Sequence, residues 1–165
     1  MILPTIYKVS ENNAGGFLAI MAKPMSGEWI DDEFSGLSNM GVTVLVSLLE
    51  VSEACDVGLQ AEQHYCEKNG IRFVHYPIPD RGVPSNKITF EKLVVALSEF
   101  LRQGNGVVIH CRAGIGRSGL LAACVLVRRE KGVSVEKAIE RISTARRVVI
   151  PDTEEQCLWI DSHIK

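Results

Sequence analysis

Short runs of β-branched residues alternate with longer runs of helical periodicity along this chain. β-Branched side chains pack well on a pleated surface, so the short runs predict strands, and an apolar stripe that recurs every three or four residues predicts helices. The expected strands are Phe17–Met21, Val42–Leu48, Arg72–Tyr76 and Val107–His110. The expected helices are Asn86–Gln103, Ser118–Lys131, Ser134–Arg146 and Thr153–His163.

The helical runs differ in how much of their surface is apolar. The run 86–103 has one apolar face, formed by Phe90, Leu93, Val94, Leu97, Phe100 and Leu101. The run 118–131 is nearly all apolar, which predicts a buried helix that ends before Gly132. Ser134 is a suitable N-cap for the next helix. Trp29, Phe34 and Leu37 have the spacing of a further helix with a buried face.

Strands separated by helices predict an α/β fold, with a central, mainly parallel sheet of four to five strands flanked by helices. Parallel sheets of this kind bind ligands at the carboxyl ends of their strands. The 165 residues are enough for one domain, which we expect to span residues 1–165.

Composition and charge limit the classes of partner. The chain is 46% hydrophobic and 23% charged, as in an ordinary globular protein, and its formal net charge is −2. This charge balance gives no reason to expect nucleic acid or an anionic membrane as a partner. The apolar runs are too short for a membrane span, and the first residues lack the pattern of a signal peptide.

The five cysteines are odd in number and form no CxxC pair; they are Cys55, Cys66, Cys111, Cys124 and Cys157. This spacing suggests neither a disulfide framework nor a zinc site, and free thiols suit a reducing compartment. The histidines likewise show no metal-ligand spacing. We therefore expect a cytoplasmic protein, a monomer, with no cofactor and no metal.

The segment HCRAGIGRSG, residues 110–119, directly follows an expected strand and directly precedes the apolar helix. A short loop in this position can aim several backbone N–H groups at one phosphate. Gly114 and Gly116 permit the positive φ angles that this requires, and Arg117 can hold two phosphate oxygens at once. Cys111 would lie beneath the phosphorus as a nucleophile. The phosphate-binding segment is then Arg112, Ala113, Gly114, Ile115, Gly116 and Arg117.

The electrostatic field of such a loop also favours the thiolate, but ionisation alone explains little. A free thiol of pKa about 8.5 is a few per cent ionised at neutral pH, so complete ionisation gains about 30-fold. Enzymes commonly reach a million-fold or more. Positioning, and donors that match the transition state, must supply the rest.

The motif resembles the signature of the protein tyrosine phosphatase superfamily, HCxxGxxR followed by Ser or Thr. The segments VTVLVSLLE, PIPDRGVPS and RRVVIPDTEEQ extend the resemblance to the compact dual-specificity branch, close to the cyclin-dependent kinase inhibitor 3 phosphatases and their bacterial relatives. The similarity runs from about Gly41 to Trp159. It implies the cysteine-phosphatase fold and phosphatase activity through a cysteinyl-phosphate intermediate.

The resemblance also implies a role for four residues outside the loop. Asp80 would protonate the leaving oxygen, and Ser118 would stabilise the departing thiolate in the second step. Gln156 would position the hydrolytic water. His110 would organise the loop by hydrogen bonding and shift the pKa of the Cys111 thiol.

Asp80, Ser118 and Gln156 each also have a simpler interpretation from the local sequence, and so do three arginines. Asp80 fits a turn, because P-D-x-G is good turn chemistry, and Ser118 fits a helix N-cap. Gln156 fits a capping box with Thr153. Arg81 would contact substrate or remain a solvated cation. The simpler reading is preferred for Arg146 and Arg147, as cations at the end of a helix.

The function expected from these residues is hydrolysis of phosphotyrosine, with phosphoserine and phosphothreonine as further substrates, in a phosphorylated protein or peptide. The alternative is the same chemistry on an inositol phosphate, a phosphoinositide or an RNA 5′-triphosphate, and Arg112 keeps this alternative open. A phosphate-binding module without catalysis is disfavoured because both Cys111 and Asp80 are present.

Overall fold

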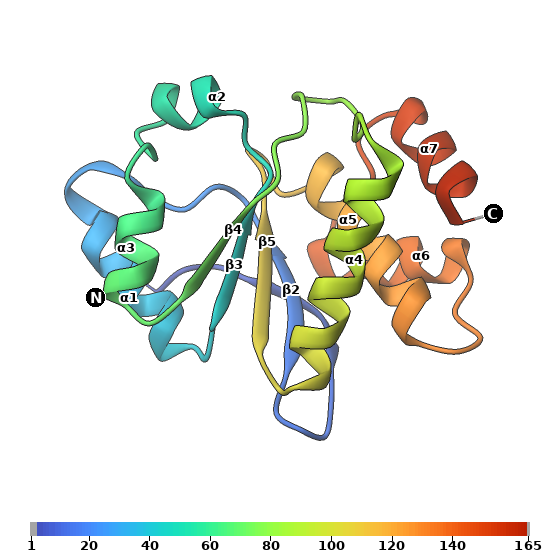
Figure 1. The fold of residues 1–165 in the computed structure, drawn as a ribbon, viewed down its shortest axis with the longest axis horizontal. Coiled ribbons are helices and arrows are strands. Elements are labelled where there is room, and N and C mark those ends of the chain that lie inside the picture. The colour runs from blue at the N-terminus through green and yellow to red at the C-terminus, as the bar shows by residue number, and fades with distance from the viewer. Residues whose placement is uncertain (1–2, 165) are drawn as a thin grey trace.

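A five-stranded sheet forms the centre of the protein, in a computed structural model that describes residues 3–164 (Figure 1). Its strands are β1 (Tyr7–Glu11), β2 (Phe17–Met21), β3 (Val44–Ser47), β4 (Arg72–His75) and β5 (Gly106–His110). They lie in the order β1-β2-β5-β3-β4. The last four strands pair in parallel, and β1 is an antiparallel edge strand. The expected mainly parallel α/β fold is confirmed.

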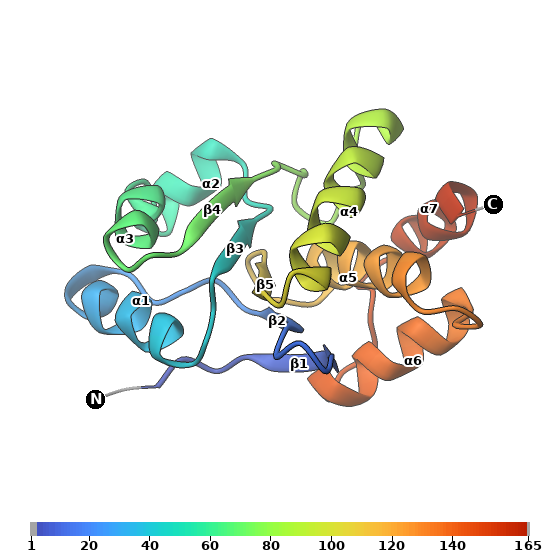
Figure 2. The same ribbon diagram turned by 60° about the horizontal axis from the view of Figure 1, so that its bottom comes forward.

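Helices cover both faces of the sheet. The helical segments are η1 (Gly27–Trp29), α1 (Ile30–Asn39), α2 (Val51–Asp56), α3 (Glu62–Lys68), α4 (Lys87–Arg102), α5 (Gly116–Arg129), α6 (Val135–Arg146) and α7 (Glu154–Ile164). Figure 2 shows α1 and α3 on one side of the sheet and α4, α5 and α6 on the other. No helix within residues 3–164 is both long enough and apolar enough to cross a membrane.

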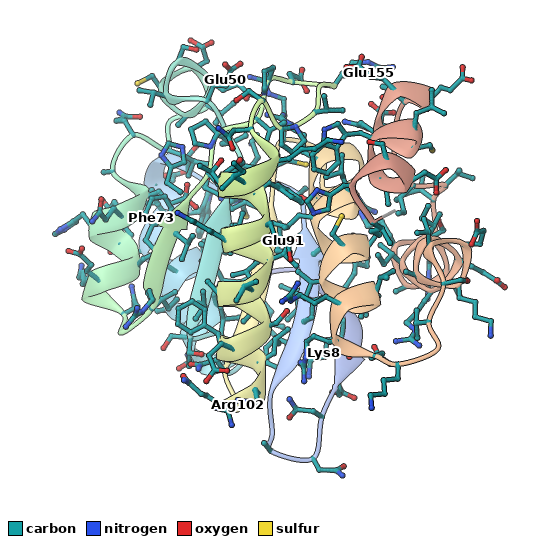
Figure 3. All side chains as sticks on the ribbon, turned by 45° about the vertical axis from the view of Figure 1, so that its right-hand side comes forward. Lys8, Glu50, Phe73, Glu91, Arg102 and Glu155 are labelled. Atoms are coloured by element: carbon teal, nitrogen blue, oxygen red, sulfur yellow. The ribbon has the colours of Figure 1, made fainter. Side chains whose placement is uncertain are left out.

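Side-chain alternation along the central strands divides the core into two layers. Val107 and Ile109 of β5 pack with α4 and α5, whereas Val108 packs with α1 and α3. Both faces of these strands are therefore buried, which is why their sequences are continuously apolar. Figure 3 shows side chains filling the space between α4 and α5, where Glu91 pairs with Arg128 of α5 and accepts a hydrogen bond from His163 of α7 at 2.9 Å.

Several expectations about individual elements need correction. β1 was not expected; its pairing with β2 shifts register between Lys8 and Ser10, so the strand lacks a regular alternation. Phe34 and Leu37 are buried in α1 as expected, but Trp29 precedes the helix and is 43% exposed. Strand β3 is shorter than the expected 42–48. Ser134 caps α6 as predicted, with its hydroxyl accepting from the Lys137 N–H at 3.2 Å.

One close approach within the sheet generates a stability prediction. Gly106 begins β5 opposite Phe17 of β2, and a Cβ atom there would lie 2.6 Å from the Phe17 ring and closer still to the Gly41 carbonyl oxygen. Because the carbonyl belongs to the backbone, it cannot turn aside. Gly106→Ala should therefore reduce the free energy of unfolding by about 2 kcal/mol, the usual cost of overpacking. A urea titration measures this, and an unchanged midpoint would contradict the close approach.

Candidate active site

The loop from Cys111 to Ile115 lies at the carboxyl end of β5, and α5 begins directly after it at Gly116. Gly114 has φ = +71°, and a Cβ atom at this position would lie 2.5 Å from the Met21 backbone. Glycine is therefore required at position 114 both by the backbone conformation and by the neighbouring strand. The positive φ expected at Gly116 is wrong, because Gly116 is the first residue of helix α5 and has no positive φ. The motif takes the strand–loop–helix context that its sequence predicts.

A cavity of about 230 Å³ opens onto this loop. Its lining consists of Asp80, Arg81, Cys111, Arg112, Ala113, Ile115, Gly116, Arg117, Asp152 and Gln156. The predicted nucleophile, the predicted acid and the late glutamine thus meet at one site, although they are far apart in the sequence. The side chains of Cys111 and Arg117 are both almost fully buried.

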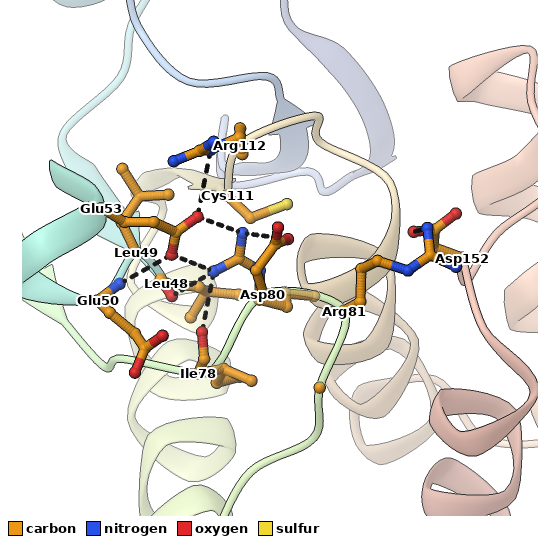
Figure 4. Close-up of polar contacts among 12 residues, drawn as sticks. Leu48, Leu49, Glu50, Glu53, Ile78, Asp80, Arg81, Cys111, Arg112 and Asp152 are labelled. Atoms are coloured by element: carbon orange, nitrogen blue, oxygen red, sulfur yellow. Dashed lines mark hydrogen bonds and ion pairs between the residues drawn. The ribbon is translucent and has the colours of Figure 1, made fainter. Parts of the chain in front are cut away.

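The Arg117 guanidinium is held by a set of acceptors from three segments, and Figure 4 labels these acceptors, Leu48, Glu53, Ile78 and Asp80. Glu53 of α2 accepts from both terminal nitrogens, at 2.7 and 2.9 Å. The Ile78 carbonyl accepts at 2.9 Å, the Leu48 carbonyl at 3.4 Å, and Asp80 Oδ1 at 3.0 Å. A planar guanidinium with this many bonds has a fixed orientation at the wall of the cavity.

The charges in this cluster stabilise one another. Burial raises the pKa of Glu53, but its hydrogen bonds with Arg117 and the Glu50 backbone, and the charges of Arg117 and Arg112, outweigh burial and lower the pKa overall. Burial lowers the pKa of Arg117, but Glu53, Cys111 and Asp80 reverse the direction. Glu53 was missed by the sequence analysis, since only its burial beside a distant arginine distinguishes it from other acidic residues.

Asp80 and Arg81 form the rim of the cavity on the segment between β4 and α4. The Asp80 side chain is 56% exposed, and one of its oxygens contacts Arg117. Arg81 adopts φ = +58° and donates to Asp152 at 2.8 Å, so it is an ion-paired residue rather than a free cation. This ion pair joins the rim to the segment that precedes α7.

Gln156 is fully buried and forms the capping box that its sequence suggested. The Thr153 N–H donates to Gln156 Oε1 at 3.2 Å, and the Gln156 N–H donates to Thr153 Oγ1 at 3.2 Å. The amide nitrogen of the same side chain donates to the Gly82 carbonyl at 2.9 Å. Gln156 therefore also anchors the segment that carries Asp80, while it lines the cavity.

Ser118 is not the N-cap of α5, because the helix begins earlier and its N-cap is Ile115. The Ser118 hydroxyl is buried and has no hydrogen-bond partner among residues 3–164. Buried hydroxyl groups are nearly always paired, so an unpaired one next to Arg117 calls for an explanation other than capping.

Arg146 braces the loop from the opposite side, which corrects the view of it as a plain helix-terminal cation. Its Nε donates to the Gly114 carbonyl at 3.1 Å, and its Nη2 donates to the Ala113 carbonyl at 3.0 Å. The guanidinium also lies over the Tyr7 ring, 4.4 Å from the centroid. With these carbonyls bonded outward, the loop can direct its N–H groups to the cavity.

His110 is buried at the end of β5 and contacts the loop directly. Its Nδ1 lies 3.2 Å from the Cys111 carbonyl oxygen, and its Nε2 lies 2.5 Å from Glu62 Oε2. Glu62 is a second acidic residue that the sequence analysis missed. Within residues 3–164, no three His, Cys, Asp or Glu side chains cluster as a metal site would need; metal-free chemistry stays a prediction.

Comparison with known proteins identifies the family. The family model described as "Polymorphic toxin system, DSP-PTPase phosphatase" matches residues 19–131. The chain belongs to the dual-specificity branch of the protein tyrosine phosphatase superfamily. Human protein tyrosine phosphatase type IVA 3 is 32% identical over 115 residues, which cover 69% of this chain and 61% of that protein. Rat cyclin-dependent kinase inhibitor 3 is 35% identical over 80 residues, covering 48% and 37%. The chain thus spans less than two thirds of the length of these two phosphatase relatives.

Solved phosphatase structures share the fold. Kinase-associated phosphatase, with its catalytic cysteine replaced by serine, superposes with a TM-score of 0.86 at 22% identity, over 97% of this chain and 93% of that one. The active form of the phosphatase Tk-PTP gives 0.80 at 24% identity, over 98% and 97%. At these identities the likeness establishes the phosphatase fold, not the substrate.

The pairing of Glu53 with Arg117 predicts a pH-dependent contribution to stability. Glu53→Gln leaves the buried guanidinium without its bidentate counter-charge, which should cost about 2 kcal/mol. The folded-state pKa of Glu53 lies below its ordinary value of 4.5, so the contribution is complete above that value and is lost as the pH falls through the folded-state pKa. The stability difference between wild type and Glu53→Gln should therefore narrow on acidification.

Urea titrations at a series of pH values measure this difference. Glu155→Gln is a matched control, because Glu155 is exposed on α7. A difference that stays constant down to strongly acidic pH would mean that the charge of Glu53 is not what stabilises the pair.

Proposed function

We propose that the chain is a cysteine-dependent protein phosphatase that hydrolyses phosphotyrosine, and also phosphoserine and phosphothreonine, in proteins or peptides. One observation carries the proposal: Cys111, Arg117 and Asp80 line a single cavity at the end of β5, in a chain that belongs to the dual-specificity phosphatase family. The cavity suits a phosphoryl group held by loop N–H groups and by Arg117. The roles below are proposals for individual residues.

In the first step the Cys111 thiolate attacks phosphorus. A phosphorus–sulfur bond forms while the bond to the leaving oxygen breaks, and Asp80 gives that oxygen a proton. A donor is needed because tyrosine phenolate has a conjugate pKa of about 10 and leaves poorly as an anion. Arg117 and the N–H groups of residues 112–117 bind the three non-bridging oxygens throughout.

In the second step water attacks the cysteinyl phosphate. Asp80, now a carboxylate, takes a proton from the water as the phosphorus–oxygen bond forms and the phosphorus–sulfur bond breaks. The unpaired Ser118 hydroxyl can donate to the sulfur as it leaves with a negative charge, which would account for its lack of another partner. Gln156 can position the water from the wall of the cavity.

The contact between Asp80 and Arg117 fits this cycle. Asp80 Oδ1 accepts a guanidinium hydrogen on Nη2 that a phosphate oxygen would also need. A bound dianion competes for this donor and repels the carboxylate. Both effects favour movement of the Asp80 side chain away from Arg117 and toward the leaving oxygen.

The charges around the cavity favour a single phosphoryl group over a polyphosphate. Arg112 forms an ion pair with Glu53, with 3.3 Å between Arg112 Nε and Glu53 Oε2, and Arg81 forms an ion pair with Asp152. The two additional cations are therefore each offset by a carboxylate, which weakens the case for an inositol polyphosphate or an RNA triphosphate. The single-domain organisation, the monomeric state and the cytoplasmic location remain predictions.

Cys111→Ser tests the nucleophile. We expect the wild-type protein to hydrolyse an aryl phosphate without added metal and to be inhibited by vanadate, and we expect turnover in the variant to fall to background. A panel of phosphotyrosine, phosphothreonine and phosphoserine peptides, inositol phosphates and an RNA 5′-triphosphate assigns the substrate class. Wild-type rates in Cys111→Ser would refute the assignment of the nucleophile.

Asp80→Asn tests the acid. The asparagine keeps the size of the side chain but cannot donate a proton to the leaving oxygen, so turnover of phosphotyrosine should fall about 100-fold or more. The defect should be smaller with p-nitrophenyl phosphate, because nitrophenolate leaves without needing a proton. Because the second step is common to both substrates, the comparison uses kcat/KM, which reports only the steps up to the cysteinyl phosphate. Equal losses of kcat/KM on the two substrates would place the proton donor elsewhere.

A further inference from the structure

His110 and Glu62 form a buried charged pair on the side of the sheet away from α4 and α5. His110 follows Ile109 in β5, so its ring points to the layer that contains α1 and α3, and Glu62 is the first residue of α3. The His110 side chain is 0% exposed and that of Glu62 is 3% exposed. The resemblance to known phosphatases accounts for the histidine of this pair but not for the glutamate.

The two hydrogen bonds of His110 fix the number of protons in the pair. A carbonyl oxygen can only accept, so Nδ1 must carry the hydrogen that bonds the Cys111 carbonyl. The contact between Nε2 and Glu62 then needs a second proton, on Nε2 or on the carboxyl group. A neutral ring protonated only at Nε2 would instead turn a lone pair toward the Cys111 carbonyl.

We propose that Glu62 is a positioning residue for Cys111, which holds His110 as an imidazolium with its Nδ1 hydrogen fixed on the Cys111 carbonyl. The carboxylate supplies the counter-charge that a buried imidazolium requires. The positive ring is then adjacent in the chain to the sulfur and favours the thiolate. The inference rests on the proposed role of Cys111, and it assigns Glu62 a part in that role.

The groups around Glu62 leave His110 as its partner. On α3, burial together with the charges of Glu62 and Glu67 raises the pKa of the Cys66 thiol, so Cys66 stays neutral. His75 of β4 donates from Nε2 to the Leu49 carbonyl at 2.7 Å. Cys55 of α2 and His75 line a small cleft that Glu62 also reaches. None of these groups supplies a cation that would replace His110.

Other charged groups act on Cys111 from the cavity side. They are Arg117, Arg112, Glu53 and Asp80. Arg117 is offset by two carboxylates and Arg112 by one of the same two, so the net charge of these side chains is small. A positive ring on the opposite side would therefore make a distinct contribution, one that a change at Glu62 can remove without altering the cavity.

Glu62→Gln separates charge from packing. The glutamine amide can donate to Nε2 of a neutral ring, while Nδ1–H remains on the Cys111 carbonyl. Both hydrogen bonds are kept and only the extra charge is lost. The test is the rate at which iodoacetamide alkylates Cys111, measured as a function of pH. Mass spectrometry of the Cys111 peptide is needed because the exposed Cys55 would also be alkylated.

In the variant we expect the half-maximal alkylation rate to move upward by about one pH unit, with roughly tenfold slower alkylation at acidic pH. Glu67→Gln is the matched control, since Glu67 is an exposed carboxylate on the same helix. It should leave the profile unchanged. If the pH profile of Cys111 alkylation is unchanged in folded Glu62→Gln, the proposal is overturned. The His110–Glu62 pair would then contribute only to packing.

A second measurement on the wild-type protein does not depend on the variant folding. Nitrogen-15 NMR of the His110 ring should show both nitrogens protonated from mildly acidic to neutral pH; a neutral ring there would overturn the proposal. Alkylation needs no turnover. A wild-type protein that is inactive on every phosphate ester would refute the proposed function, while the pH profile of Cys111 alkylation would still test Glu62. An active wild-type protein, with an alkylation profile that is unshifted in Glu62→Gln, would refute only the role of Glu62.

Discussion

The burial of Arg117 is the constraint on which the site depends. A guanidinium removed from water loses several kcal/mol of hydration unless it is paired and hydrogen-bonded. Here the acceptors come from the end of β3, from α2 and from the segment after β4, and they meet the arginine at the start of α5. Satisfying this one cation therefore brings together the segments that form the cavity. The loop 111–117 is therefore one part of a cluster of segments that surround the charge of Arg117.

The sheet makes this assembly possible because its parallel strands end at one edge. The carboxyl ends of β3, β4 and β5 bring Leu48, Ile78 and Cys111 to the same side of the molecule. The short α2 then returns Glu53 to the arginine. Strand pairing thus places the groups within reach, and the buried charge selects their final orientation.

The sequence was most informative where the chemistry is local. The loop 110–117, its flanking strand and helix, and the capping by Ser134 and Gln156 each depend on residues a few positions apart. Glu53, Glu62 and Arg146 contact the loop across 64, 48 and 32 or 33 positions, and no periodicity marks them. The edge strand β1 was missed because a register shift disrupts its alternation.

Ser118 shows how a local rule can give the wrong boundary. Serine is a good N-cap, but α5 begins two residues earlier, at Gly116, which lies against Gln156. A Cβ atom at Gly116 would lie 2.8 Å from the Gln156 amide oxygen. The start of the helix therefore does not follow capping preference, and the Ser118 hydroxyl has no hydrogen-bond partner within the described residues 3–164.

Charge balance links the two sides of the nucleophile. On the cavity side, Glu53 and Asp80 offset Arg117 and hold it in place, and the dianion of the proposed reaction would displace part of that pairing. On the other side, the partner of His110 is buried and out of reach of the substrate. A dianion entering the cavity reorganises the first set of charges but not the second. In the proposed cycle, the buried pair would hold its field constant between the attack on phosphorus and the release of the sulfur, and a nucleophile that must also leave benefits from a field of this kind.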